Sequence, residues 1–403
     1  MSRTVVLAYS GGLDTSVCVR WLADRGFRVV AFMADVGQGE PAPALIRRAK
    51  VAGASEVVVR DLRREFAADY VLPSLKAHAV YEGKYLLATA LSRPLIAKHL
   101  VEEARRHRAS AVAHGCTGKG NDQVRFEVTI RALDPGLQIL APVREWAFKS
   151  REEEARYAVR RRIPIHVNVK SPYSIDQNLW GVSIEAGALE DPWREPPQDS
   201  YRWLRPLTRT PSKPSGLTLD FQRGTPVSIN GRRLDVVTLI SELNHLGAAH
   251  GIGRSDLIES RLVGIKSREV YEAPAATILL EAHADLERLV LDRELLHAKQ
   301  YVGLKYAELV YYGLWFTPLK HALDAFVHET QRRVSGTVRL KLFKGTCQVV
   351  GRKSPYGLYR RRLATYAKGD AFDQSAAAGF IKLWGLPYEN MFKAPGSRLK
   401  GKA

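Results

Sequence analysis

The chain has 403 residues, of which 45% are hydrophobic and 26% charged. These values are typical of soluble globular proteins and exclude a collagen-like, low-complexity or intrinsically disordered chain. The length is enough for two to three domains of about 150 residues each. The formal net charge of +19 favours anionic partners. Because the basic runs are short and scattered, we interpret them as solvated faces and do not expect nucleic acid as a partner.

The apolar segments are too short for a membrane helix, which needs about 20 apolar residues, and the run at residues 5–9 is too short for a signal peptide. The cysteines, Cys18, Cys116 and Cys347, are far apart and lack CxxC spacing. We therefore expect no disulfide framework and no zinc site or other metal site built from protein side chains alone. The short apolar segments likewise predict no membrane association. A reducing, cytoplasmic location is the resulting prediction.

The first third of the chain alternates short apolar segments with amphipathic ones, which predicts βαβ units on a parallel sheet. We expect strands at residues 4–9, 29–34, 56–59 and 111–113, and a helix at residues 94–106.

After about residue 165, proline and glycine become frequent, and alternating segments at residues 218–221 and 227–229 predict antiparallel strands of a second domain. Helices are expected at residues 236–246 and 285–312, followed by a hairpin of residues 337–343 and 347–350. We interpret the aromatic residues between 301 and 315 as helix core. Residues 380–386 are a candidate C-terminal arm for a neighbouring subunit.

A glycine-rich segment lies between the first predicted strand and the helix that follows it: Ser10, Gly11, Gly12, Leu13, Asp14, Thr15 and Ser16. Adjacent glycines let the backbone approach a ligand, and the N-terminus of the helix directs N–H groups and a positive dipole end at an anion. The segment therefore predicts a phosphate site, with Asp14 as a magnesium ligand or a helix cap. A glycine turn with capping residues is the alternative for the two glycines alone.

A second constellation occupies residues 114–127, again at a strand-to-helix junction, with glycines at 115, 118 and 120. Its Thr, Asn, Asp and Arg side chains supply the donors and acceptors that suit an amino acid's carboxylate and amine. A flexible loop capped by Asn121 and Asp122 is the alternative for each residue taken singly. Cys116 lies in this loop, but no partner histidine supports a nucleophilic role.

The first motif resembles the SGGxDS/T pyrophosphate loop of the N-type ATP pyrophosphatases, or PP-loop enzymes, which cleave ATP between the α and β phosphates. It matches neither GxxxxGK[ST] nor GxGxxG. Together with the second motif, the sequence resembles the argininosuccinate synthase family nearly end to end. The further matching segments comprise residues 34–38, 82–85, 173–179, 185–187, 189–192, 251–254, 264–268 and 271–272.

The resemblance implies an α/β fold in three parts. Residues 1–168 would form a parallel-sheet nucleotide-binding domain of the adenine nucleotide α-hydrolase type. Residues 169–365 would form an α+β synthetase and multimerisation domain, and residues 366–403 a C-terminal helical oligomerisation arm. The family joins citrulline to aspartate using ATP with Mg²⁺, through a citrullyl-adenylate, and releases AMP and pyrophosphate in arginine biosynthesis or the urea cycle. A homotetramer is also implied.

The resemblance also implies site residues. ATP would be bound by Ala8, Tyr9, Ser10, Gly11, Gly12, Leu13, Asp14, Thr15, Ser16, Ala34 and Gly115. Aspartate would be bound by Thr117, Asn121 and Asp122, and citrulline by Tyr85, Asn121, Arg125, Ser174, Ser183, Glu259 and Tyr271. Catalytic roles would fall to Asp14, Asp122 and Arg125, with Asp122 orienting or deprotonating the aspartate amine unless a substrate phosphate oxygen does so.

The chain departs from the family pattern at Ala90, where the family usually has Ser, and at Ser260, where it commonly has Asn. A lost neutral hydrogen bond costs about 0.5–1.5 kcal/mol, so we expect weakened citrulline binding with the chemistry retained. Two alternatives remain. A tRNA-thiolating PP-loop enzyme would need a persulfide-carrying cysteine pair or an RNA-binding module, and we identify neither. The second is a non-catalytic nucleotide-binding descendant of the enzyme, and Ala90 is the only residue we identify that favours it.

Overall fold

The structure is a computed structural model that describes residues 3–39, 42–148, 150–163 and 172–395. The chain divides into two compact units, Met1–Tyr356 and Gly357–Ala403. The expected domain boundary between residues 168 and 169 lies outside the described residues. None of the helices in the described ranges is both long and apolar enough to cross a membrane.

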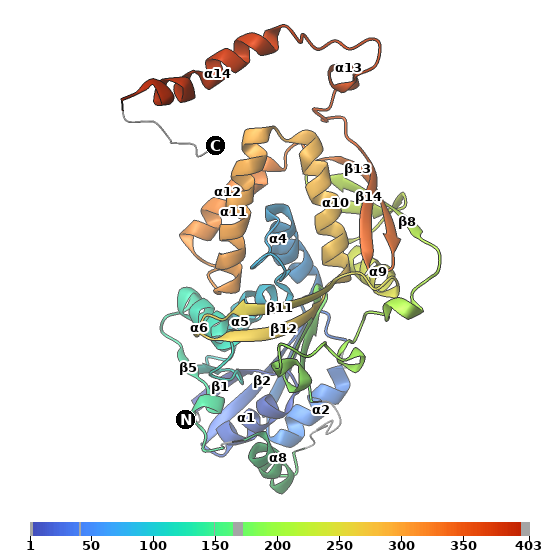
Figure 1. Ribbon diagram of the computed structural model, residues 1–403. Helices are drawn as coiled ribbons and strands as arrows, with labels where there is room; N and C mark the ends of the chain where they lie inside the picture. The colour runs from blue at the N-terminus through green and yellow to red at the C-terminus, as the bar shows by residue number, and fades with distance from the viewer. Residues whose placement is uncertain (1–2, 40–41, 149, 164–171, 396–403) are drawn as a thin grey trace. The chain divides into compact units, whose positions relative to one another are not determined.

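The first unit begins with a parallel sheet of five strands in the order β3-β2-β1-β4-β5. Figure 1 labels β1, β2 and β5 of this sheet. The strands are β1 (Arg3–Ala8), β2 (Phe27–Asp35), β3 (Glu56–Asp61), β4 (Ala111–Ala113) and β5 (Gln138–Leu140). Successive strand residues point to opposite faces, so Val5 and Leu7 pack in one core while Val6 packs in another. This arrangement confirms the predicted parallel α/β domain.

Helices cover both faces of the parallel sheet. The helices α1 (Leu13–Ala23) and α2 (Ala42–Ala52) pack in the core that contains Val5, together with α8 (Arg151–Arg160). The helices α5 (Ala88–Arg106) and α6 (Asp122–Leu133) pack in the core that contains Val6. Between β3 and α5 the chain forms α3 (Arg63–Glu65), a π-helical segment η1 (Phe66–Val71) and α4 (Leu72–Ala77), and α7 (Pro142–Glu145) follows β5.

Two antiparallel sheets follow within the same unit. The first has the order β11-β12-β7-β6, with β6 (Ser174–Asn178), β7 (Gly181–Glu185), β11 (Arg254–Ser260) and β12 (Lys266–Glu272). The second has the order β10-β9-β8-β13-β14, with β8 (Ser215–Gln222), β9 (Thr225–Ile229), β10 (Arg232–Arg233), β13 (Gly336–Phe343) and β14 (Thr346–Lys353). The expected antiparallel strands and the hairpin after residue 337 are confirmed.

The remaining helices of the first unit are mostly long. They are α9 (Val236–Ala249), α10 (Pro274–Val290), α11 (Arg293–Tyr311) and α12 (Pro318–Thr330), with short 3-10 turns η2 (Gly187–Glu190), η3 (Gln198–Ser200) and η4 (Leu207–Arg209). Helices α10, α11 and α12 pack against α4 (Figure 1). The second unit contains α13 (Arg361–Ala364) and α14 (Ala376–Lys393), so the C-terminal part is helical as predicted.

Two predicted helices had wrong bounds. The single helix expected over residues 285–312 is two helices, because Asp292 caps a new one by accepting a hydrogen bond from the Leu295 N–H at 3.0 Å. The helix expected from Pro94 begins at Ala88, so Pro94 lies inside it. Burial of Leu91 and Leu95 in the core outweighs the hydrogen bond that proline removes.

Candidate active site

The turn between β1 and α1 requires a glycine at its centre. Gly11 has φ of +81°, and a Cβ atom there would lie 2.2 Å from Cδ2 of Leu45. Across the turn, Ser10 Oγ and Thr15 Oγ1 lie 3.1 Å apart. The first turn of α1 adds N–H groups that have no partner within the helix, at the positive end of its dipole. The turn therefore has the properties of a phosphate site.

The loop between β4 and α6 lies directly against this turn. A Cβ atom on Gly115 would lie 2.8 Å from Cγ2 of Thr15, so only glycine lets the two loops approach this closely. The neighbouring residue His114 is buried, and its Nε2 lies 3.2 Å from Oε1 of Glu127. The two loops follow β1 and β4, between which the strand order reverses. Doubly wound sheets bind ligands at this position.

Cys116, in the same loop, is not an activated thiol. Burial and the nearby carboxylate of Asp122 raise the pKa of the Cys116 thiol above its ordinary value. The thiol therefore stays protonated near neutral pH, whereas a nucleophilic cysteine needs a lowered pKa.

Two carboxylates and two guanidinium groups form an ion-pair network at the start of α6. Asp122 accepts a hydrogen bond from Nε of Arg93 at 2.9 Å and another from Nη1 of Arg125 at 2.7 Å. Arg93, on α5, also pairs with Asp176 of β6. The network thus joins the nucleotide-binding part of the chain to the antiparallel sheet through charged groups.

The carboxyl groups of this network titrate differently. Burial alone would raise the pKa of Asp122, but the charges of Arg93 and Arg125 outweigh it and lower that pKa. The pKa of Asp176 is raised, because burial outweighs its one guanidinium partner. Asp122 is therefore an anion and a weak proton acceptor at neutral pH.

Glu259, on β11, is a buried carboxylate that receives two tyrosine hydroxyls. The Tyr271 hydroxyl donates to its Oε2 and the Tyr311 hydroxyl to its Oε1, each at 2.6 Å. Burial and the nearby carboxylates raise the pKa of both tyrosines, so both hydroxyls remain protonated. Asn121 donates to the Tyr311 hydroxyl oxygen at 2.7 Å. Three of the predicted citrulline residues, Glu259, Tyr271 and Asn121, thus lie in one cluster.

The antiparallel sheet presents further site residues in register. Tyr271 of β12 lies opposite Ser183 of β7, and Ser183 lies opposite Asp176 of β6. Opposite residues of neighbouring strands share a face of the sheet. Thr89 of α5 approaches this face, with its Oγ1 3.4 Å from Ser183 Oγ. Tyr85 also reaches it, since its ring stacks on that of Tyr271 with centroids 4.2 Å apart.

The structure brings most of the predicted site residues together. The ATP residues Ala8, Tyr9, Ser10, Gly11, Gly12, Leu13, Asp14, Thr15, Ser16 and Gly115 form the touching loops, and Ala34 lies near the end of the adjacent strand β2. Tyr85, Asn121, Asp122, Arg125, Ser183, Glu259 and Tyr271 form the ion-pair network and the tyrosine cluster. Thr117 and Ser174 are exposed, and neither has a hydrogen bond from its side chain to another described residue.

The two departures from the family pattern occupy different surroundings. Ala90 is fully buried in the first turn of α5, and its N–H donates to the Tyr85 hydroxyl at 3.2 Å. Ser260 Oγ accepts a hydrogen bond from Lys266 Nζ at 2.6 Å. Because strand neighbours point to opposite faces, Ser260 faces away from the cluster around Glu259. The side chain at position 90 therefore lies beside the predicted citrulline residues, whereas the side chain of Ser260 points away from them.

Sequence reasoning missed three residues of this site: Arg93, Asp176 and Tyr311. Asp176 lies in a segment that resembles the family, so its charged side chain could have been recognised from the sequence as a candidate site residue. Arg93 is four residues beyond Thr89 on α5, hence on the same helix face. Tyr311 is buried in a helix, as interpreted, but its hydroxyl lies in the site. The same interpretation is wrong for Tyr301, which lies on α11 but is 76% exposed.

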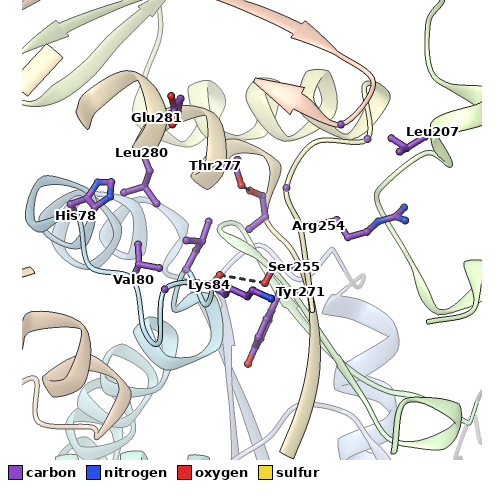
Figure 2. A pocket seen from close by; sticks show the side chains of 16 residues that line it. His78, Val80, Lys84, Leu207, Arg254, Ser255, Tyr271, Thr277, Leu280 and Glu281 are labelled. Carbon is purple, nitrogen blue, oxygen red and sulfur yellow. Dashed lines mark hydrogen bonds between the residues drawn. The ribbon is translucent and has the colours of Figure 1, made fainter. Parts of the chain in front are cut away.

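A cavity of about 520 Å³ adjoins the site (Figure 2). Tyr271 and Lys84 lie at one end of it, and Leu280 and Glu281 of α10 at the other. Ser255 Oγ donates to the Lys84 carbonyl at 3.4 Å beside this cavity. The cavity therefore borders both the segment that carries Tyr85 and the strand that carries Tyr271.

The parallel sheet, the glycine turn and the loop packed against it define a nucleotide-binding α/β enzyme of the PP-loop class. Two family models match the chain: an "Arginosuccinate synthase N-terminal HUP domain" over residues 4–164 and an "Arginosuccinate synthase C-terminal domain" over residues 173–391. The chain belongs to the argininosuccinate synthase family.

Relatives that bear the name argininosuccinate synthase match nearly the whole chain. The protein of Bacillus licheniformis is 57% identical over 385 residues, which cover 96% of this chain and 95% of that protein. The protein of Bacillus subtilis is 56% identical with the same coverage, and that of Aquifex aeolicus is 54% identical over 99% of both chains.

Proposed function

We propose that this protein joins citrulline to aspartate with ATP, forming argininosuccinate, AMP and pyrophosphate in arginine biosynthesis. The observation that carries the proposal is the contact between Gly115 and Thr15, which sets the phosphate turn beside the loop that leads to Asn121 and Asp122. Relatives 54–57% identical bear the name of this enzyme. A tRNA-thiolating enzyme and a non-catalytic nucleotide-binding descendant are therefore not favoured.

The first half of the proposed reaction activates citrulline. The ureido oxygen of citrulline attacks the α-phosphorus of ATP, the bond to the β-phosphate oxygen breaks, and a citrullyl-adenylate forms. The N–H groups of the turn at Gly11 and of the first turn of α1 hold the departing pyrophosphate. The protein contributes position and charge, because the attacking oxygen belongs to the substrate.

Asp14, in the first turn of α1, is the residue that fits Mg²⁺ at this site. Mg²⁺ is commonly held by one or two carboxylates together with substrate phosphates. Within the described ranges, no group of at least three His, Cys, Asp or Glu side chains could hold a metal alone. A bound Mg²⁺ would neutralise phosphate charge. ATP oxygens would therefore complete the coordination that Asp14 begins.

The second half of the proposed reaction joins aspartate. Its amine, in the uncharged form, attacks the activated ureido carbon, AMP leaves with the former ureido oxygen, and the amine's proton passes to a phosphate oxygen of the departing AMP. Asp122 orients the amine through its negative charge, and its lowered pKa favours this role over deprotonation. Arg125 and Arg93 keep Asp122 in place and add positive charge for the anionic substrates.

Citrulline carries one cationic group, its α-ammonium, and Glu259 is the carboxylate among the predicted citrulline residues. We therefore assign the α-ammonium to Glu259, with the stacked rings of Tyr85 and Tyr271 beside it. A charged group held at a buried carboxylate gives a strong and directional contact.

The proposed assembly is a homotetramer in the cytoplasm. Each subunit would have three domains: residues 1–168, 169–365 and 366–403. The C-terminal unit supports an intersubunit role for its arm, because α14 exposes large apolar side chains. Phe380, Ile381, Leu383 and Trp384 are each more than 60% exposed. Apolar surface of this kind is typical of protein interaction sites. Light scattering on the full chain and on a Trp384→Glu variant would measure the assembly directly.

The function is tested by following pyrophosphate and AMP release from Mg-ATP. Purified protein is assayed with citrulline plus aspartate and with each amino acid alone, over a wide citrulline range because of Ala90. We expect sustained release with both substrates together, and argininosuccinate as the product. Absence of turnover at saturating citrulline, with ATP still bound, would overturn the proposal and direct attention to RNA substrates.

A further inference from the structure

Tyr311 is the common partner of three side chains that come from different parts of the site. Its hydroxyl donates to Oε1 of Glu259 and accepts from Nδ2 of Asn121, at 2.6 and 2.7 Å. Its backbone carbonyl accepts from Nε of Arg125 at 2.9 Å, and its ring lies beneath that guanidinium, 4.8 Å from ring centroid to Cζ. The last residue of α11 thus touches β11, the cap of α6 and the first turn of α6.

The direction of each hydrogen bond around Tyr311 is fixed. The Leu262 N–H donates to Oδ1 of Asn121 at 2.8 Å, so the amide nitrogen of Asn121 must face the tyrosine. That nitrogen is a donor, hence the Tyr311 oxygen accepts from it and gives its own proton to Glu259. The chain from Leu262 through Asn121 and Tyr311 to Glu259 therefore has one polarity and sets the carboxylate's orientation.

The packing leaves Tyr311 little freedom. It is fully buried, and its ring stacks on that of Tyr81 with centroids 3.6 Å apart at an angle of 7°. Two residues later, Gly313 has φ of +75°, and a Cβ atom there would lie 2.7 Å from Cα of Arg125. The segment that ends α11 is thus held against the backbone of α6, and the hydroxyl has a fixed position.

We infer that Tyr311 is a positioning residue that sets Glu259 and Asn121 for the α-ammonium end of citrulline. The inference rests on the proposed function and goes beyond it, because Tyr311 is not among the predicted substrate residues. Without the hydroxyl, Glu259 loses the donor to its Oε1 and Asn121 loses the acceptor of its amide nitrogen. The carboxylate can then rotate away from the orientation that receives the ammonium. The phosphate turn at Gly11 involves none of these groups, so binding of ATP does not depend on Tyr311.

The test is Tyr311→Phe, which removes the hydroxyl and keeps the stacked ring. We expect the KM for citrulline to rise about tenfold or more, as a hydrogen bond to a charged group implies, with the KM for ATP within about twofold of its original value. Preference for citrulline over 5-ureidopentanoate, which lacks the α-amine, should fall by a similar factor. A purely structural role would not change that preference.

Tyr306→Phe is the matched control. Tyr306 lies on the same helix, is fully buried, and donates its hydroxyl to Asp324 at 2.8 Å, among residues that the proposal does not use. It should keep both the citrulline KM and the preference. An unchanged citrulline KM in Tyr311→Phe, or an equal change in Tyr306→Phe, would overturn the inference. Absence of argininosuccinate from the unsubstituted protein would instead overturn the proposed function, so the two failures are distinguishable.

Discussion

Replacing Asp122 with Asn tests the assignment of its charge. Asp122 contacts Arg93 Nε and Nη2 at 2.9 and 2.8 Å and Arg125 Nη1 at 2.7 Å, so the amide would leave two guanidinium groups without their shared anion. A hydrogen bond to a charged group is worth about 1.5–3 kcal/mol. The side chain is 26% exposed, which screens the charges. We expect a loss of unfolding free energy of about 2–3 kcal/mol, with the fold retained.

The catalytic effect should fall on the second half-reaction. The aspartate amine loses an anionic partner, and about 2.7 kcal/mol of lost transition-state stabilisation corresponds to a rate about 100-fold lower. A rapid-quench assay would separate the first turnover of pyrophosphate release from the formation of argininosuccinate. We expect the first to be little changed and the second to fall about 100-fold in Asp122→Asn.

Asp134→Asn is the control for this substitution. It makes the same charge change on a carboxylate that is 25% exposed and pairs with Arg105 at 3.1 Å, after the end of α6. Both half-reactions should proceed normally in this variant. Argininosuccinate formation at the original rate in Asp122→Asn would refute the reasoning, because it would show that the amine needs no anion at this position.

Three further outcomes follow from the geometry. Ala90→Ser should lower the KM for citrulline by up to about tenfold in steady-state assays, because the serine hydroxyl adds a hydrogen-bond donor beside Tyr85. An unchanged KM would mean that water or Thr89 already supplies this hydrogen bond. Gly115→Val should raise the KM for ATP, because the valine Cβ would lie 2.8 Å from Thr15 Cγ2 and would push the loop away from the phosphate turn. An unchanged KM for ATP would contradict the close approach of Gly115 to Thr15. Hydrogen bonding from His114 and the charge of Arg144 lower the pKa of Glu127 in the folded protein. The ionised Glu127 carboxylate therefore stabilises the fold at pH values above its unfolded pKa of about 4.3. This contribution to the free energy of unfolding is lost as the pH falls through the folded pKa. Urea midpoints from pH 6 to 3 should therefore fall less steeply in Glu127→Gln than in the original protein.

Most of the parallel sheet was predictable from sequence because its central strands β2, β1 and β4 are short, apolar and largely buried, and such strands give a strong local signal. Val5, Val6 and Leu7 illustrate this, since each is 0% exposed and the run leads directly into the glycine turn. The edge strand β5 is only partly buried and was not predicted. The bounds of α5 were not predictable. Proline usually marks the start of a helix, and only the tertiary packing of Leu91 and Leu95 makes Pro94 an interior residue.

The site was predictable only where a motif carried it. The residues of the phosphate turn are consecutive in sequence, so a single motif identifies all of them. Tyr311 and Glu259 are 52 residues apart and meet through a hydrogen bond between the last residue of α11 and β11, which no local pattern records. Burial in a helix is also the ordinary property of a core tyrosine, so the hydroxyl's partner could be found only from the structure.

The register that aligns Tyr271, Ser183 and Asp176 has a consequence for how this gene can change in length. Side chains alternate between the faces of a strand, so one codon inserted or deleted within β7 or β12 would turn every later side chain of that strand to the opposite face. Point substitutions in these strands alter one contact each, whereas a change of length would remove several site residues at once. Natural length variation in this region should therefore be confined to loops outside the site, such as the one around Trp193, which is 96% exposed.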